Sequence, residues 1–188
     1  ARRTETSISL APLENGEYGI SETGDNFVWQ ASPEFTELKA GTEYQFKTRI
    51  KYDPETGMES IASDSIMYQT LVPFEGSRVT GVAMDGSYVS GTKLTAAAVG
   101  NGMDNMNPVE GDSRWIPRTW NWGQKAFNSW KDNYTIPFTL VEVGNYRLSV
   151  DFEREDYTGG AWKASGEVKA YTIPFKVTAA PVTQYTIT

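Results

Sequence analysis

Hydrophobic and polar residues alternate one by one along three stretches of the chain. In residues 44–52 and 146–153 the even positions are mostly apolar and the odd positions polar, and residues 171–177 alternate with apolar residues at the odd positions. Successive side chains of a β-strand point to opposite faces, so each stretch predicts a strand with one buried and one wet face. Pro174 cannot donate a ladder hydrogen bond, and its strand is therefore expected at a sheet edge or bulged there.

No stretch longer than two turns has the periodicity of an amphipathic helix, and 17 glycines and 9 prolines divide the chain into short segments. This pattern predicts an all-β fold. Residues 38–44 and 140–146 each contain a glycine turn followed by a tyrosine that opens an alternating strand, at Tyr44 and Tyr146. Each is the sequence form of a tyrosine corner. Two corners predict two consecutive antiparallel β-sandwiches, in residues 1–72 and 73–178, with 179–188 a C-terminal tail or the start of a further module.

The first half resembles a known family. Residues 17–21 and 29–44, from Trp29 to Tyr44, are similar to fibronectin type III-like modules of Gram-positive surface and secreted multidomain proteins, and the resemblance covers about residues 5–72. The second half resembles a bacterial immunoglobulin-like module, through the corner at Tyr146 and a central strand that carries Trp120. The resemblance implies a non-catalytic structural or adhesive segment of an exported bacterial protein. It also implies an extracellular location, secreted or cell-wall attached, within a longer, monomeric chain.

Composition narrows the chemistry that the chain can perform. The 188 residues include no cysteine and no histidine, which excludes histidine-dependent triads, thiol nucleophiles and thiolate metal sites. With 24 acidic against 17 basic residues, the net charge is −7, which argues against binding of nucleic acid. No apolar run reaches the roughly 20 residues that a membrane span needs, so no membrane insertion is expected.

Residues 114–134 are rich in aromatic side chains, and they suggest an alternative function. Trp120 is expected in the core, whereas Trp115, Trp122 and Trp130 are expected to stay exposed and to stack on sugar rings. Arg118 and Asn121 would then bond the sugar hydroxyl groups. This alternative is a carbohydrate-binding module in residues 73–178, with a polysaccharide or a host or cell-surface glycan as its partner. In the simpler and favoured interpretation, Trp120 is core and the other aromatic residues cover loops or the seam between the two domains.

The oxygen-rich segment 101–112 is a weak candidate for calcium, which prefers hard oxygen ligands. Its candidate ligands are Asp104, Asn107 and Asp112, but their spacing does not match an EF-hand loop, and an ordinary connecting loop is the favoured interpretation. No other cofactor is expected. The carboxylates of residues 151–156 are expected on the solvated face of a hairpin around residues 157–160, and no catalytic motif accompanies them, so the chain is not expected to be an enzyme.

Overall fold

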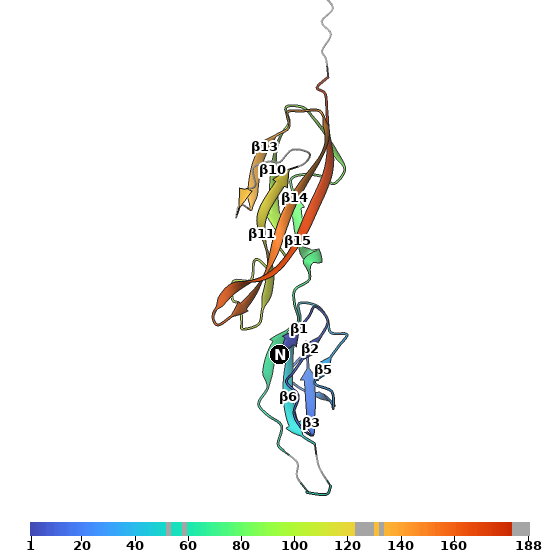
Figure 1. The fold of residues 1–188 in the computed structure, drawn as a ribbon, viewed down its shortest axis with the longest axis vertical. Coiled ribbons are helices and arrows are strands. Elements are labelled where there is room, and N and C mark those ends of the chain that lie inside the picture. Colours follow the sequence, from blue (N-terminus) through green and yellow to red (C-terminus); the bar gives the residue numbers. More distant parts are fainter. Residues whose placement is uncertain (52–53, 58–59, 123–129, 132–133, 182–188) are drawn as a thin grey trace, which may run out of the picture. The chain divides into compact units, whose positions relative to one another are not determined.

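The computed structural model describes residues 1–51, 54–57, 60–122, 130–131 and 134–181, and it confirms the prediction of an all-β chain folded into β-sandwiches (Figure 1). By contacts between Cα atoms the chain divides into two compact units. Unit 1 contains Ala1–Pro73, Asp104–Arg114 and Glu155–Lys163, and unit 2 contains Phe74–Met103, Trp115–Arg154 and Ala164–Thr188. The first break falls one residue from the predicted boundary at 72–73. Two short segments of the second half, however, join unit 1.

Unit 1 contains a sandwich of three and four strands. Its strands are β1 (Arg2–Arg3), β2 (Ile8–Ser9), β3 (Gly16–Ser21), β4 (Val28–Gln30), β5 (Glu34–Phe35), β6 (Glu43–Ile50) and β7 (Ile66–Gln69). One sheet has the order β1-β2-β5 and the other β4-β3-β6-β7. Both contribute to one core, formed by Ile8, Tyr18, Phe35, Tyr44 and Phe46. The predicted strand with one buried face is therefore confirmed in residues 44–50, because Tyr44 and Phe46 are buried on one face of β6.

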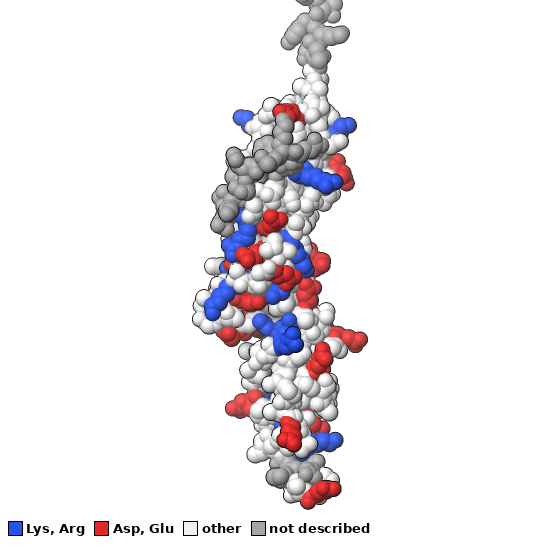
Figure 2. Space-filling model, in the orientation of Figure 1, with Lys and Arg blue, Asp and Glu red and all other residues white. Residues whose placement is uncertain are grey.

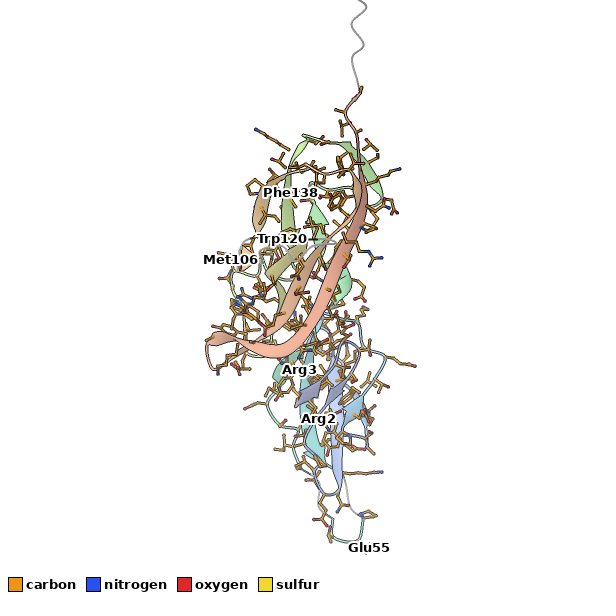
Figure 3. All side chains as sticks on the ribbon, turned by 45° about the horizontal axis from the view of Figure 1, so that its top comes forward. Arg2, Arg3, Glu55, Met106, Trp120 and Phe138 are labelled. Carbon is orange, nitrogen blue, oxygen red and sulfur yellow. The ribbon has the colours of Figure 1, made fainter. Side chains whose placement is uncertain are left out.

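Unit 2 contains a sandwich of three and five strands. The remaining elements are η1 (Phe74–Gly76), β8 (Arg78–Thr80), β9 (Gly86–Val89), β10 (Lys93–Val99), β11 (Ser113–Trp122), β12 (Trp130–Lys131), β13 (Thr135–Thr139), β14 (Gly144–Thr158) and β15 (Ala161–Thr178). Of these, β11, β14 and β15 also extend into the segments 104–114 and 155–163, which belong to unit 1. The sheets have the orders β13-β10-β8 and β12-β11-β14-β15-β9. Trp120 lies in the core with no exposed surface, as predicted, and Figure 3 shows it among the side chains of this sandwich. The immunoglobulin-like character of this half stays a prediction.

Both predicted tyrosine corners are present. The hydroxyl group of Tyr44 accepts a hydrogen bond of 3.0 Å from the backbone N–H of Lys39. The hydroxyl group of Tyr146 donates one of 2.9 Å to the carbonyl oxygen of Glu142. Each bond ties the first residues of a long strand to the turn before it, as the spacing of glycine and tyrosine indicated.

The strands β14 and β15 form the predicted hairpin, with its turn at Gly159 and Gly160. Both glycines have positive φ, 61° and 78°, as a tight two-residue hairpin turn requires. The expectation that the strand of Pro174 lies at a sheet edge holds at that residue but not for the whole strand, because β15 pairs with β9 only from Phe175 to Thr178. The carbonyl oxygen of Pro174 accepts a hydrogen bond from Asp85 N–H just before β9 begins. In a strand, the N and the C=O of one residue point toward the same neighbouring strand. The N–H that Pro174 lacks would therefore point to the place where the pairing with β9 starts.

Candidate functional site

Trp115 is not available as a stacking surface, and the expectation that it stays exposed is wrong. Its side chain is only 1% exposed. The ring of Phe74 packs edge-on against it, with ring centres 5.1 Å apart, and the ammonium of Lys169 lies 5.2 Å from its ring centre. Phe74 also packs on Phe152, at 5.6 Å. Trp115 therefore belongs to the core of unit 2, closed by a residue from the segment between the two halves of the sequence.

Strand β11 does not follow the strict alternation of a regular strand. Trp115 and Trp120 have opposite parity in the sequence and yet both are buried, and so is Ile116. The inward face therefore changes parity between these two tryptophans, a segment that contains Pro117. Proline disrupts a regular ladder, and one displaced residue moves every later side chain to the other face.

The two polar members of the expected sugar platform bind acidic side chains of the neighbouring strand β14. Arg118 Nε donates to Glu153 Oε2 at 3.1 Å, and Asn121 Nδ2 donates to Asp151 Oδ2 at 3.0 Å. A sugar hydroxyl group would have to compete with these carboxylates. Trp122 and Trp130 lie on β11 and β12, and their side chains are outside the described residues. The structure therefore does not bring the five predicted platform residues together as one exposed site.

Oppositely charged side chains form further pairs, and Figure 2 shows basic and acidic side chains next to one another. Arg114 Nη2 lies 2.7 Å from Glu155 Oε2, and Arg154 and Lys169 both pair with Glu167. Glu155 is 7% exposed, so its predicted place on the solvated face is wrong. The guanidinium of Arg114 also stacks on Trp162, 4.1 Å from the ring centre. These basic and acidic side chains therefore neutralise one another within the protein.

The candidate calcium ligands do not lie in one cluster of exposed oxygens. Asp104 and Asn107 are exposed, whereas Asp112 is buried. Asp112 Oδ2 accepts hydrogen bonds from Asn105 Nδ2 at 2.8 Å and from Val109 N–H at 3.0 Å, so this carboxylate organises its own loop. Within the part of the chain that the structure describes, no three His, Cys, Asp or Glu side chains gather as a metal site. Calcium binding stays a prediction, and the segment is a connecting loop between β10 and β11.

Sequence reasoning missed an aromatic and cationic layer on the outer face of unit 1. The ring of Trp29 lies over Gly19, where an added Cβ atom would come within 3.1 Å of the indole. The guanidinium of Arg49 stacks on the same ring, 4.2 Å from its centre, and also pairs with Glu17 at 2.7 Å. Lys47 lies over Phe27 in the same way. The signal was present: Gly19 interrupts strand β3 opposite Trp29, and a strand glycine marks a close approach.

One exposed ion pair changes the titration of a side chain. Lys39 Nζ lies 2.9 Å from Glu22 Oε1. The hydrogen bond and the negative charge of Glu22 raise the pKa of the Lys39 ammonium above its ordinary value of 10.5. Both groups are mostly solvent-exposed, so this pair contributes little to stability.

The first and last strands of the five-stranded sheet, in sequence order, pair in parallel. Strand β9 pairs with β15 in parallel, from Gly86 opposite Phe175 to Val89 opposite Thr178. Backbone hydrogen bonds of 2.8 Å close both ends of this pairing, from Asp85 N–H to Pro174 O and from Ser90 N–H to Thr178 O. Thr178 Oγ1 also donates to Tyr88 O at 3.1 Å. Strand β9, the second strand of this sandwich, and its last strand β15 are therefore bonded side by side and run in the same direction.

Comparison with known proteins adds information on fold class alone. No family model and no curated protein matches the chain. Solved structures similar to it include the fibronectin(III)-like modules of Clostridium thermocellum CbhA, with 14% identity, 99% of this chain and 93% of that chain covered, and a TM-score of 0.32. A two-module fibronectin type III segment of chicken tenascin has 13% identity, coverages of 92% and 94%, and a TM-score of 0.33. The FN1–FN3 domains of chicken CNTN1 have 11% identity and a TM-score of 0.35, with 97% of this chain and 66% of that chain covered.

These neighbours all consist of fibronectin type III modules, the class that residues 5–72 resemble. At TM-scores below 0.5 the similarities say nothing about what this chain binds. In the part that the structure describes, no helix is long and apolar enough to cross a membrane. The sheets and the buried residues of the chain show an all-β fold of β-sandwiches, with aromatic cores and internally paired charges.

Proposed function

We propose that this chain is a non-catalytic structural segment of an extracellular multidomain protein and that it carries mechanical load along its length. The observation that supports this proposal is the parallel pairing of β9 with β15. The closed aromatic cores and the ion pairs within the sheets are consistent with a passive module, as is the resemblance to modules of exported surface proteins.

The load-bearing role follows from the direction of the two strands. Tension on the chain pulls β9 toward its N-terminal end and β15 toward its C-terminal end. Because the strands are parallel and adjacent, these forces slide them past one another along their common axis. The hydrogen bonds between them are then loaded together in shear and must break together. In an antiparallel hairpin pulled from its open end, the bonds would break one after another.

Single-molecule force spectroscopy on the whole chain tests this proposal. Ser90 N–H donates to Thr178 O at 2.8 Å and closes the C-terminal end of the pairing between β9 and β15. Ser90→Pro removes that donor, worth roughly 1 kcal/mol, from the sheared ladder. We expect Ser90→Pro to lower the unfolding force of unit 2.

Ser90→Ala is the matched control, since it changes the same side chain and keeps the N–H, and both variants lose the hydrogen bond from Ser90 Oγ to Val141 O. It should leave the unfolding force unchanged. Equal forces for both variants and the unaltered chain would contradict the load-bearing role, as would unfolding of unit 2 at very low force.

Carbohydrate binding stays the alternative function, now without Trp115. It depends on Trp122 and Trp130, which belong to adjacent strands because β11 and β12 are hydrogen-bonded neighbours. Titration of the chain with polysaccharides, followed by tryptophan fluorescence, tests it. A saturable shift that Trp122→Ala abolishes would favour this alternative, and an unchanged spectrum would count against it.

A further inference from the structure

Unit 2 has a groove of 640 Å³ on the outer side of its five-stranded sheet. Strand β14 contributes Asn145, Tyr146 and Arg147, strand β15 contributes Pro174, Phe175 and Lys176, and the turn before β9 contributes Asp85. Neighbouring strands and the turn bonded to them therefore build the groove, and the ladders between them fix the spacing of its walls.

The alternation of β14 and β15 directs the polar side chains of this set to the outside. Leu148 and Val150 on β14, and Phe175 and Val177 on β15, are buried, so the residues of opposite parity face solvent. Ser149 Oγ and Thr172 Oγ1 lie 2.9 Å apart on this outer face, and they set the alignment of the two strands. This alignment places Arg147 beside Pro174, and the hydrogen bond from Asp85 N–H to Pro174 O brings the Asp85 turn to the same place.

The charges of the groove differ from those of the rest of the sheet. Farther along β14, Glu153 pairs with Arg118, and Arg154 pairs with Glu167 on β15. Arg147 and Lys176 are both exposed, and neither has an ion-pair partner among the described residues. Asp85 is the one acidic residue of the lining. In a chain of net charge −7, two unpaired cations beside one groove form a local site for an anion.

We propose that this groove binds an acidic sugar of a uronate-containing polysaccharide. Arg147 offers a planar pair of donors for a sugar carboxylate, and Lys176 adds a second positive charge. The carboxylate of Asp85 accepts hydrogen bonds from sugar hydroxyl groups, and the ring of Pro174 offers an apolar surface to the C–H face of a sugar. The inference goes beyond the proposed structural role, which stands if the groove binds nothing.

Titration of the whole chain with polygalacturonate at low ionic strength, followed by isothermal calorimetry, tests the proposal. Arg147→Gln and Lys176→Gln should each weaken binding by roughly tenfold, the loss of one charge-assisted hydrogen bond. The control is Lys93→Gln, which removes the charge of an exposed lysine on β10, in the other sheet. It should leave the affinity unchanged. All three positions are exposed, so an unchanged melting temperature verifies that the variants fold.

Two further probes separate sugar recognition from simple charge attraction. Dextran, a neutral polysaccharide, should not bind. Polyglutamate has a similar charge density without hydroxyl groups, and it should bind more weakly than polygalacturonate. The proposal is overturned if polygalacturonate does not bind, if Lys93→Gln weakens binding as much as the groove variants, or if polyglutamate binds as tightly. This last result would identify the groove as a site for acidic peptides.

Discussion

At the scale of single residues, one device recurs in this chain. The hydroxyl groups of Tyr18, Tyr44 and Tyr88 each accept a hydrogen bond from the backbone N–H of the residue five positions earlier. The residue three positions before each tyrosine has a left-handed backbone, with φ of 54° at Asn15, 63° at Gly41 and 55° at Asp85. Asn, Asp and Gly adopt this conformation most readily, so each turn residue and its tyrosine act as a pair. Sequence reasoning found only the copy at Tyr44, although the sequence Asx-Gly-x-Tyr marks the other two.

Tyr44→Phe tests how much the hydrogen bond between the tyrosine hydroxyl group and the backbone contributes to stability. Tyr44 is 6% exposed, and removal of its hydroxyl group leaves the N–H of Lys39 without this acceptor. We expect the free energy of unfolding to fall by about 1–3 kcal/mol, measured by urea denaturation. Tyr68→Phe is the control. Tyr68 packs against Phe46 through its ring, and its hydroxyl group makes no hydrogen bond within the described ranges, so we expect a change of at most about 0.5 kcal/mol. Equal losses in the two variants would contradict the role of the corner.

At the scale of elements, strand β11 decides what the aromatic residues of this chain can do. The backbone of Trp115 passes so close to Gly100 that a Cβ atom there would lie 1.7 Å from the Trp115 carbonyl oxygen. Gly100 therefore lets the start of β11 approach the end of β10, and the indole of Trp115 lies inside unit 2 against Phe74. A tryptophan that a sequence pattern presents as a ligand platform is here a packing residue.

Trp115→Ala should therefore act on stability. Removal of a fully buried tryptophan costs about 3–5 kcal/mol, because the transfer free energy is lost and a cavity is left. Trp162→Ala is the matched comparison, since Trp162 is half-buried and packs against Tyr157 at the hairpin. Chemical denaturation of both variants should give a clearly larger loss for Trp115→Ala. A smaller loss for Trp115→Ala than for Trp162→Ala would place Trp115 outside the core. Trp115→Phe provides a milder variant should the alanine variant fail to fold.

At the scale of the whole molecule, ion pairs occupy many of the charged side chains that a binding surface would use. Arg147 and Lys176 have no ion-pair partner among the described residues, and both line the groove between β14 and β15. The mechanical and binding roles depend on different groups. Ser90→Pro changes the backbone bonds between β9 and β15, whereas Arg147→Gln changes an exposed side chain of β14, so each experiment can fail without the other.

The sequence by itself determined the fold class, the long strands around residues 44–50, 146–153 and 171–177, both tyrosine corners and the buried Trp120. These features depend on local alternation and on turns of a few residues, which a linear pattern records. Only the tertiary structure decided the fate of Trp115, the burial of Glu155 and the interior place of the strand of Pro174. Each of these depends on contacts between residues far apart in the chain: Phe74 with Trp115, Arg114 with Glu155, and β9 with β15. Periodicity records which residues share a face, but it does not record which distant segment covers that face.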